Sequence, residues 1–494
     1  MLTRSVPVRP AGQAATDRWI APAAQIGFLL AVGLLIWTCC LYLSHAAFLD
    51  HIESAVLISG WQYLNGMPLY GIEGGAPHFA TYYGPLTYLA PLPAMLLFGP
   101  SVSAGKLLFV LAPLLTTAVM GWHFWRRKVV SAPAGLFYLV SGLLIFGRII
   151  FWLRPDPLET LLVAIAVALA ATQAAALGVG ICLGLIVNLK IHAFLYILPI
   201  LFDLWQRRGW RPPVVALASS LIVFLIPFLF PGISFADYHF GLAQQVGARA
   251  ADLRLAKPWL TVSLVFACPL LAGLANARPT TTRGDRRYVL AAIAVLLLLA
   301  YPATFPGAGA YHLLPLVPVF ADGFSRIPTR LPALLSVFIV ITIGAVVAAT
   351  VRDAATELGW QTIATEEAVA FAQAKPGKTV QVGYGETTTY YQVSQLARAV
   401  LALQGRPAQI DAQVLMELQY VGFDGSSRWT PLVSGCRVDN WIIPHNETPF
   451  ALHSYYDQEP VFDGAFRAAF MASYRLERAG QHFDLWRCIS QMPG

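Results

Sequence analysis

The stretch WIAPAAQIGFLLAVGLLIWTCCLYL, residues 19–43, is an apolar run with very few polar side chains. It is long enough to cross a membrane as a helix, which takes roughly 20 apolar residues. The run follows Arg4, Arg9 and Arg18, as the apolar core of a secretory signal would. That core has only about 7–15 residues, however. The sequence therefore predicts an uncleaved first transmembrane span.

The rest of the chain has the same character. Of its 494 residues, 57% are hydrophobic and 12% are charged, and the mean hydropathy is +0.61. A soluble globular chain has roughly 25% charged residues, so the composition excludes an ordinary soluble protein. The formal net charge of +7 does not indicate a nucleic-acid partner. Lys and Arg stand in short clusters between apolar runs, whereas nucleic-acid binding gathers them on one exposed face.

Further apolar runs predict the remaining spans. With the first, they lie near 19–43, 103–125, 130–148, 157–175, 177–190, 192–205, 212–230, 258–276, 288–305, 311–325 and 331–351. The short pair 177–190 and 192–205 also fits one span and a re-entrant piece. We expect a membrane all-α fold of about eleven transmembrane helices.

The basic clusters predict the orientation. They are Arg4, Arg9 and Arg18; Arg126, Arg127 and Lys128; Arg207, Arg208 and Arg211; Arg278, Arg283, Arg286 and Arg287; and Arg326 and Arg330. With eleven spans every cluster falls on one side, and Lys and Arg are retained on the cytoplasmic side. The N-terminus is therefore expected in the cytoplasm and the C-terminus outside it.

Three regions follow from this topology: a cytoplasmic tail (1–18), a transmembrane domain (19–351) and an extracytoplasmic domain (352–494). The first external segment, 44–101, contains two apolar stretches, His51 to Asn65 and Pro85 to Phe98, which we expect to lie along the outer membrane surface.

From Ala364 onward the composition becomes that of a small soluble α/β domain. The patterns predict a strand at 379–383, a helix at 390–403 and a hairpin at 475–486. Cys436 and Cys488 are the only two cysteines of this domain. Outside the cytoplasm they are able to pair or to stay free, and we predict that they form a disulfide.

Asp50 and Glu53 follow the first span and lie three residues apart, on one side of a helix. A carboxylate there is reached both by a lipid head group and by an external acceptor, so it is a candidate base. The alternative is that the pair caps the helix, with Glu53 in a capping-box position.

Charged residues also interrupt apolar segments at the expected outer face. Arg154 and Asp156 stand before a span, Lys190 and His192 break the run from Cys182 to Leu201, and His312 begins another span. Buried cations of this kind usually face a cavity or an anion, so we predict that they bind a phosphate head group or its sugar. The alternatives are snorkelling to the interface, an N-cap role for Asp156 and a structural role for His312.

The expected external loop 231–257 adds Arg249, Arg254 and Lys257, which surround a lipid phosphate or form a solvated face. No P-loop, G-x-S-x-G, H-E-x-x-H or C-x-x-C motif is present, so ATP-driven transport, serine hydrolysis and zinc chemistry lack motif support.

The order of these features resembles the GT-C superfamily of polytopic glycosyltransferases, which includes protein O-mannosyltransferases and the lipid A aminoarabinose transferase. The resemblance covers roughly residues 20–350. It rests on the following segments: Asp50-His-Ile-Glu53, Asn65-Gly-Met-Pro-Leu-Tyr70, Tyr82-Tyr83-Gly-Pro-Leu-Thr-Tyr88, Arg154-Pro-Asp156, Lys190, and Tyr311-His312-Leu-Leu-Pro315.

The resemblance implies a donor sugar on a polyprenyl phosphate and an extracytoplasmic acceptor: a glycan, lipid or protein. Asp50 would be the general base of an inverting displacement, and Lys190 with Arg154 would stabilise the departing lipid phosphate. Tyr82 and Tyr83 would help to bind the donor. Several family members have adjacent Asp-Glu where this chain has Asp-x-x-Glu. Since the leaving group is a monophosphate, we expect no cofactor and no essential metal, although some members use a divalent metal.

These expectations place the chain in a bacterial inner membrane, with membrane lipids as further partners. Three other functions remain open: a lipid-linked-glycan transporter or flippase, an O-antigen polymerase or ligase, and a non-catalytic scaffold. The absence of evident internal repeats favours the transferase over the transporter.

Overall fold

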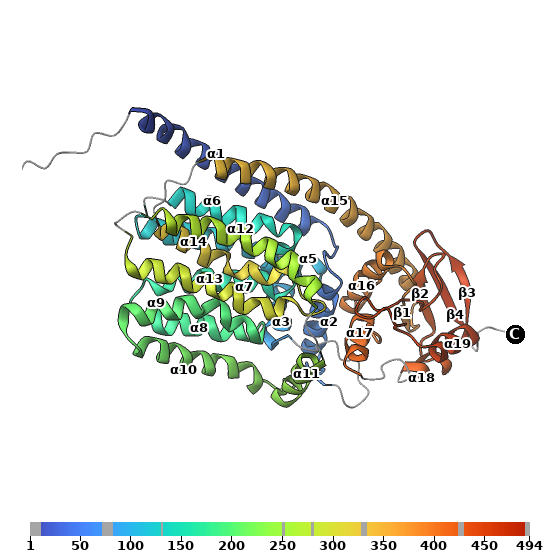
Figure 1. Ribbon diagram of the computed structural model, residues 1–494. Coiled ribbons are helices and arrows are strands. Elements are labelled where there is room, and N and C mark those ends of the chain that lie inside the picture. The colour runs from blue at the N-terminus through green and yellow to red at the C-terminus, as the bar shows by residue number, and fades with distance from the viewer. Residues whose placement is uncertain are drawn as a thin grey trace, which may run out of the picture.

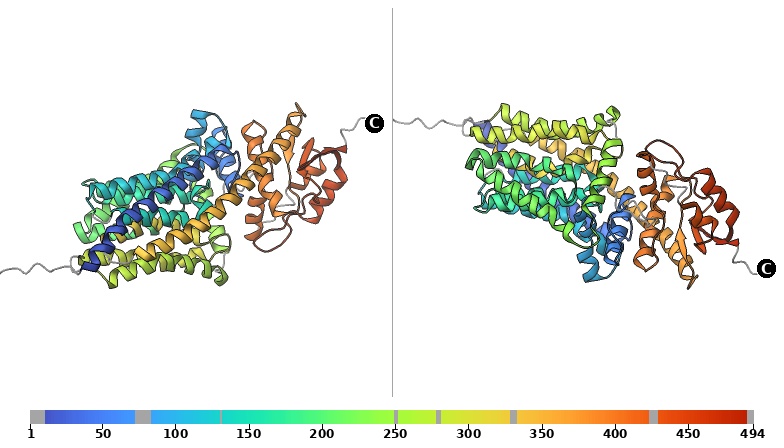
Figure 2. Two further views of the ribbon diagram at one scale, coloured as in Figure 1. Left: turned by 90° about the horizontal axis from the view of Figure 1, so that it is seen from above. Right: turned by 90° about the horizontal axis from the view of Figure 1, so that it is seen from below.

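The computed structural model describes residues 11–71, 83–129, 132–248, 252–277, 281–327, 333–422 and 429–489. Figure 1 shows two parts: a bundle of helices, and a smaller C-terminal domain of helices and strands. In both views of Figure 2 the long helix α15 (Ala333–Gln373) runs from the bundle into the C-terminal domain.

Every predicted span coincides with helical structure in the bundle. The α-helices concerned are α1 (Ala11–Ser44), α5 (Val102–Arg126), α6 (Ala132–Ile145), α7 (Pro155–Ala170), α8 (Ala175–Val187), α9 (Leu198–Arg208), α10 (Arg211–Leu225), α12 (Ala256–Ala275), α13 (Arg283–Ala303), α14 (Val317–Arg326) and α15. Shorter helices in the bundle are η1 (Gly147–Phe151), η3 (Ile226–Leu229), α11 (Phe235–Ala248) and η4 (Leu253–Leu255). The mostly helical fold is confirmed.

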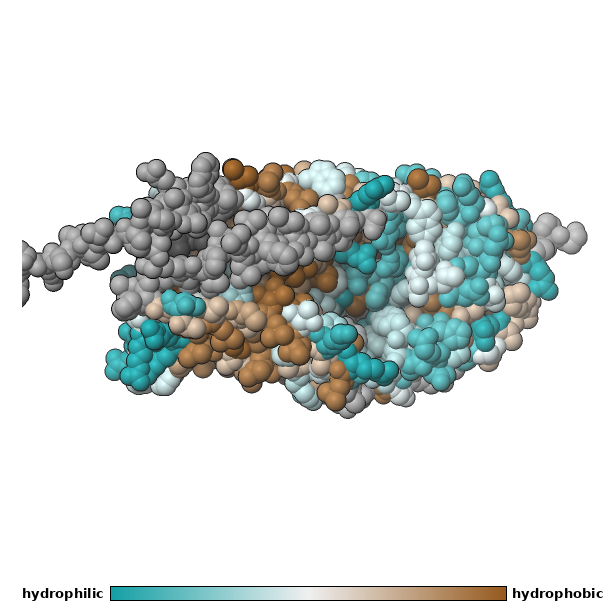
Figure 3. Space-filling model, turned by 45° about the horizontal axis from the view of Figure 1, so that its top comes forward, coloured by the Kyte–Doolittle hydropathy of each residue, from teal (hydrophilic) through white to brown (hydrophobic). Residues whose placement is uncertain are grey.

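By length and composition, five described helices are able to cross a membrane: Gln25–Ser44, Val102–Arg126, Arg211–Leu229, Leu253–Ala275 and Arg283–Ala303. Three further apolar helices, Pro85–Phe98, Gly135–Ile145 and Ala175–Val187, have 10–17 residues. The count of eleven spans remains a prediction. In Figure 3 hydrophobic surface gathers over the bundle and hydrophilic surface over the C-terminal domain. The chain is therefore a multi-pass membrane protein.

Two segments of the bundle begin as 3₁₀ turns. η2 (Ile191–Ile197) continues as α9, and η5 (Ala310–Leu316) continues as α14. Pro199 and Pro318 follow the two junctions in the first turn of each α-helix, where proline is well tolerated. The irregular turns place side chains from two distant parts of the sequence at one end of the bundle.

Three of the basic clusters form ion pairs with carboxylates at the end of the bundle that is opposite to the two 3₁₀ turns. The ion pairs are Arg127–Asp322 (3.7 Å), Arg207–Asp285 (4.0 Å) and Arg326–Asp203 (3.1 Å). They join α5, α9, α13 and α14. The clusters thus lie together, as the topology requires, while the orientation of the termini remains a prediction.

The first external segment differs in part from its prediction. α2 (Ile52–Leu64) is a helix, but it is buried on nearly all sides and packs on α16 (Thr388–Leu403) of the C-terminal domain. The expectation that it lies along the membrane surface was wrong, because the C-terminal domain covers it. α3 (Pro85–Leu89) and α4 (Leu92–Phe98) follow, and α4 exposes apolar side chains at its end, as an interfacial helix does.

The C-terminal domain contains a four-stranded sheet in the order β1-β2-β4-β3. Its elements after α15 are β1 (Val380–Val382), α16, α17 (Ala412–Tyr420), α18 (Thr430–Ser434), β2 (Asn440–Pro444), α19 (Gly464–Ser473), β3 (Tyr474–Ala479) and β4 (Phe483–Cys488). β1 and β2 are parallel, with Val380 opposite Asn440, and the other pairs are antiparallel. The hairpin predicted at 475–486 is the β3–β4 pair.

Cys436 and Cys488 form a disulfide with Cα atoms 5.9 Å apart. It links the segment before β2 to the end of β4. The boundary predicted at residue 352 falls inside α15, since Ala364, Ala368 and Phe371 of this helix pack in the core of the C-terminal domain.

Candidate active site

A cavity of about 410 Å³ lies between the two 3₁₀ turns, α11 and α13. One part of its wall is charged or aromatic, with Tyr83, Arg154, Lys190, His192, Tyr311 and His312. The other part is largely apolar, with Phe194, Leu195, Leu242, Leu298, Pro302 and Phe305. The cavity therefore suits an amphipathic, anionic ligand.

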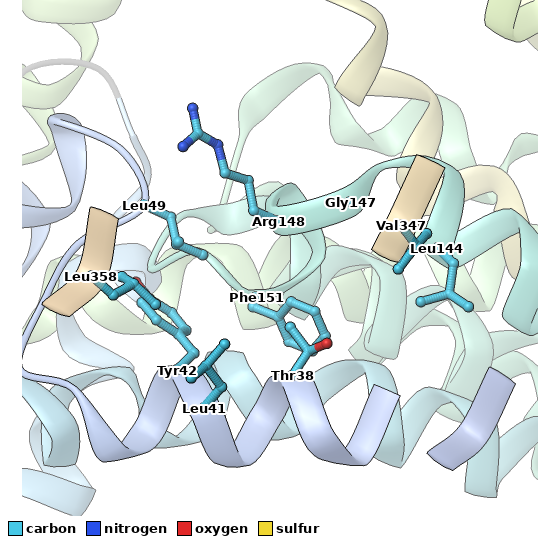
Figure 4. A pocket seen from close by; sticks show the side chains of 10 residues that line it. All are labelled: Thr38, Leu41, Tyr42, Leu49, Leu144, Gly147, Arg148, Phe151, Val347 and Leu358. Carbon is cyan, nitrogen blue, oxygen red and sulfur yellow. The ribbon is translucent and has the colours of Figure 1, made fainter. Parts of the chain in front are cut away.

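A second cavity, of about 30 Å³, lies between α1, α6, η1 and α15. Figure 4 shows apolar side chains around it, with the guanidinium of Arg148 pointing away. It has room for little more than a water molecule, so we place the candidate site in the larger cavity.

Lys190 is held in the site by Asp156. Its Nζ lies 2.6 Å from Asp156 Oδ1, and both side chains are buried. Pro155 opens α7 and Arg154 is its N-cap residue without a side-chain cap. The N-cap role considered for Asp156 was therefore wrong: its carboxylate faces Lys190.

The first external segment packs directly on the backbone beside Lys190. The Gly84 N–H donates to Leu189 O at 3.0 Å, and the Thr87 hydroxyl donates to the same oxygen at 3.1 Å. A Cβ atom on Gly84 would lie 2.0 Å from Asn188 O. Only glycine fits this approach, which brings neighbouring Tyr83 to the cavity.

Arg154 connects the cavity to Asp50. One guanidinium nitrogen lies 3.4 Å from Asp50 Oδ1, and another donates to the Tyr311 hydroxyl at 3.0 Å. The group also lies over the rings of Trp152 (4.1 Å) and Tyr311 (4.9 Å). These contacts fix a planar cation at the cavity wall, while its Nε has no hydrogen-bond partner among the described residues.

The side chain of Asp50 contacts both the start of α2 and Arg154. Its Oδ1 accepts from the Ile52 N–H at 2.9 Å, a capping contact at the start of α2. Its side chain is 16% exposed and faces Arg154. Burial raises the pKa of Asp50, but His51, Arg154 and the Ile52 N–H outweigh it and hold the pKa below its ordinary value. Asp50 is therefore an ionised carboxylate at neutral pH.

Glu53 is fully buried, and its two oxygens accept hydrogen bonds from four donors. Oε1 accepts from the N–H groups of Leu49 (2.6 Å) and Asp50 (2.7 Å), and Oε2 from the Leu153 N–H (2.8 Å) and the Tyr42 hydroxyl. Glu53 thus ties the loop of Asp50 to the residue before Arg154. This geometry fits a positioning role better than the catalytic role expected with Asp50.

His192 and His312 come together from the two 3₁₀ turns. Their ring nitrogens Nε2 and Nδ1 are 3.1 Å apart, and His312 stacks on Tyr311 with ring centroids 4.6 Å apart. Both rings line the cavity. They add polar groups beside Lys190 and Arg154.

The whole chain is similar in fold to a known structure. ArnT from Cupriavidus metallidurans, bound to undecaprenyl phosphate, matches with a TM-score of 0.56 at 11% identity. The match covers 95% of this chain and 98% of that one. This chain has the ArnT fold. The apo state of the same enzyme matches with a TM-score of 0.54 at 11% identity, over 94% and 98% of the two chains.

No protein-family model matches the sequence, and no curated protein matches it either. The likeness to ArnT is therefore one of fold. The resemblance inferred from the order of motifs is confirmed as a likeness of fold.

Within the ArnT-like bundle, some predicted site residues are not at the cavity. Arg254 is exposed and pairs with Asp252 of its own turn at 3.2 Å, and Lys257 is exposed on α12. Neither lines the cavity, so the basic set expected around the phosphate does not form from these two. Tyr82 and Arg249 lie outside the described residues.

The sequence interpretation missed two polar residues next to the site. Glu159 is fully buried on α7, and neither of its oxygens has a hydrogen-bond partner in the described part of the chain. The hydroxyl of buried Tyr196 likewise has none there. The signal for Glu159 was its spacing, because a residue three positions after Asp156 lies on the same helix face.

The structure also bears on metal ligands. Among the described residues, no three His, Cys, Asp or Glu side chains gather closely enough to hold a metal ion. The expectation that no metal is essential stays a prediction.

Proposed function

We propose that this protein is a membrane glycosyltransferase that moves a sugar from a polyprenyl-phosphate donor to an extracytoplasmic acceptor. The observation that carries the proposal is the amphipathic cavity, which has Arg154 and Lys190 in one part of its wall and an apolar surface in the other. A lipid phosphate has the same division of charge and hydrocarbon. The likeness to ArnT bound to undecaprenyl phosphate supports this choice of ligand.

The two cations recognise the phosphate in different ways. The planar guanidinium of Arg154 offers paired donors that match phosphate oxygens, whereas Lys190 provides a compact charge. Contacts with Tyr311 and Asp156 hold both cations in place before a ligand arrives. A preorganised pair of this kind stabilises negative charge that develops during a reaction.

Asp50 is the proposed general base. It takes the proton of an acceptor hydroxyl while that oxygen attacks the anomeric carbon, and the bond from that carbon to the phosphate oxygen breaks. The bonding electrons leave with the lipid phosphate, whose charge changes from about −1 to −2. Arg154 lies between the base and the cavity. A single displacement in this arrangement inverts the anomeric configuration.

The acceptor is a glycan, lipid or protein with a free hydroxyl on the extracytoplasmic side. This follows from the predicted topology, in which the cavity and Asp50 lie toward the C-terminal domain. Asp50 reaches the surface in part, since its side chain is 16% exposed.

The test is transfer by purified protein from a radiolabelled polyprenyl-phosphate sugar. We expect release of lipid phosphate that depends on an added acceptor and is lost in Asp50→Asn. Asp252→Asn is a matched control, because Asp252 Oδ1 also accepts a backbone N–H two residues on (2.9 Å) and pairs with an arginine.

A flippase would move the labelled lipid between the leaflets of a proteoliposome without cleaving it. A scaffold would do neither. Intact donor after incubation with a range of acceptors would exclude the transferase.

A further inference from the structure

The C-terminal domain contacts the residue next to the proposed base. His51 Nε2 lies 3.0 Å from the hydroxyl of Tyr455, and the His51 ring packs against the rings of Tyr391 (5.5 Å) and Tyr455 (5.1 Å). On its other side, His51 Nδ1 lies 3.9 Å from Asp50 Oδ2. One imidazole therefore joins the C-terminal domain to Asp50.

The hydrogen bonds around Tyr455 decide where the imidazole proton lies. Gln413 Nε2 donates to Glu417 at 2.7 Å, so the Gln413 carbonyl faces the tyrosines. That carbonyl accepts from the hydroxyls of Tyr391 (3.0 Å) and Tyr455 (2.7 Å). The Tyr455 hydroxyl also lies 3.2 Å from that of Tyr456, a longer contact. With its only proton directed to the closer Gln413 carbonyl, the Tyr455 oxygen accepts the proton of His51 Nε2. Nδ1 of neutral His51 then presents a lone pair toward Asp50.

Buried groups of the C-terminal domain hold this arrangement. Gln395 Nε2 lies within hydrogen-bond distance of the Tyr391 hydroxyl (3.2 Å) and Asp411 (3.1 Å), and Asp411 pairs with Arg398 at 2.9 Å. Gln395 also accepts from the Ser54 hydroxyl of α2 at 2.8 Å. These side chains are almost fully buried, which favours a fixed arrangement behind the Tyr391 ring, whereas Tyr455 itself is 36% exposed.

We propose that His51 is a positioning residue for Asp50, that it takes over the proton which Asp50 removes from the acceptor, and that Tyr455 of the C-terminal domain holds it in the required tautomer. The inference rests on the proposed glycosyl transfer with Asp50 as base. It gives the C-terminal domain a part in the reaction that the cavity alone does not explain.

The proton moves from the acceptor to Asp50, then to His51 and finally to water. The acceptor hydroxyl loses its proton to the Asp50 carboxylate as the new bond to the anomeric carbon forms and the phosphate leaves. Asp50 then passes that proton to the Nδ1 lone pair of His51 through one bridging water, because Asp50 Oδ2 and Nδ1 are 3.9 Å apart. The carboxylate is thereby regenerated and the imidazole becomes a cation. His51 is 21% exposed and returns the proton to water before the next turnover.

The surroundings of His51 keep it neutral at rest. Burial lowers the pKa of His51 below its ordinary value and Arg154 adds to this effect, whereas Asp50 and Asp411 oppose it. Besides these residues the ring faces Tyr391 and Tyr455. An imidazole that is neutral at pH 7 is able to accept a proton.

The first test replaces His51 by glutamine, which keeps a donor for Tyr455 but has no basic nitrogen. We expect kcat to fall roughly tenfold or more, with little change in donor KM. In the wild type, kcat should fall in acid as His51 becomes protonated, with a midpoint below about pH 6.5. In His51→Gln that acid limb should move to lower pH. The control is His453→Gln, at an exposed histidine of the C-terminal domain.

The second test is Tyr455→Phe, which removes the oxygen that accepts from Nε2 and keeps the ring. We expect a smaller loss of kcat with the acid limb retained. Tyr390→Phe, whose ring packs against Trp360 instead, should behave as the wild type. Unchanged kcat and an unchanged acid limb in His51→Gln would overturn the inference, as would unchanged kcat in Tyr455→Phe.

A third measurement does not depend on turnover. The ¹⁵N chemical shifts of histidine, assigned by comparison with His51→Gln, should show neutral His51 with its proton on Nε2, and Tyr455→Phe should perturb that signal. A proton on Nδ1 would overturn the inference even if the protein transferred no sugar. Absence of transfer by the wild type would instead refute the proposed function.

Discussion

Replacing Lys190 by methionine separates the structural part of the site from its binding function. Lys190 lies 2.6 Å from Asp156, and both groups are buried. Removal of the lysine leaves the carboxylate of Asp156 without its cation, and breaking a buried pair in this way costs about 3–5 kcal/mol of stability. Lys190→Met should therefore be clearly destabilised.

The double variant Lys190→Met with Asp156→Asn removes both charges. Neutral replacement of a buried pair costs much less than breaking it, so we expect most of the stability to return. The donor phosphate would still lack its partner. A hydrogen bond to a charged group contributes about 1.5–3 kcal/mol, and tenfold in affinity corresponds to about 1.4 kcal/mol. Donor affinity should therefore stay reduced by roughly 10- to 150-fold.

The assay measures thermal unfolding in detergent together with donor KM and kcat for the single variants, the double variant and the control Lys257→Met. The control lysine is exposed on α12 and does not line the cavity. A stable double variant with the donor KM of the wild type would refute the reasoning. Lys190 would then serve only to neutralise Asp156.

The remaining predictions concern the base, the topology, the disulfide and the metal. Asp50→Asn should lower turnover on the order of 10²-fold or more while the protein stays folded and binds donor lipid; near-normal turnover would make another carboxylate the base. In a background without reactive cysteines, a cysteine placed at exposed Gln404 should react with an impermeant reagent in intact cells and one at Arg126 should not. Serine at Cys436 and Cys488 should destabilise the C-terminal domain by about 4 kcal/mol for a loop closed over 52 residues, seen as a lower unfolding temperature. Chelation with EDTA should leave turnover unchanged, and loss restored by added divalent metal would show that the reaction needs one.

Hydropathy alone located the predicted spans as helices, whereas α11 formed within the expected external loop 231–257. The apolar runs had to form helices because a lipid environment leaves backbone groups no other partner. The sequence did not predict that two of these helices begin with a 3₁₀ turn. Nothing in the apolar runs around η2 and η5 distinguishes a 3₁₀ turn from an α-helix. These turns depend on packing between segments that lie more than a hundred residues apart in the sequence.

Tertiary contacts also changed the interpretation of the sequence pattern of α2. Its mixture of apolar and polar side chains suits a helix at a membrane surface, and the same pattern suits a helix covered by another domain. The hydrogen bond from Ser54 to Gln395 spans most of the chain. No local pattern predicts such a contact, so the position of the C-terminal domain on α2 had to come from the structure.

The site residues were detectable for a simple physical reason. A charge within an apolar segment is unfavourable unless it is paired or used, and this drew attention to Arg154 and Lys190. The sequence did not reveal which carboxylate serves which purpose. Asp50 and Glu53 are similar in type and near in sequence. Both oxygens of Glu53 accept hydrogen bonds, from four donors in all, whereas the carboxylate of Asp50 faces Arg154.

Pairing explains how the site remains stable when no ligand is bound. Arg154 with Asp50 and Lys190 with Asp156 are each close to neutral as pairs, so the bundle does not carry two uncompensated cations. In the proposed transfer Asp50 becomes protonated just as the leaving phosphate gains negative charge. Arg154 is then released from its carboxylate at the moment when the phosphate needs it most. The contact between Asp50 and Arg154 thus links proton removal on one side of the guanidinium to stabilisation of the leaving group on the other.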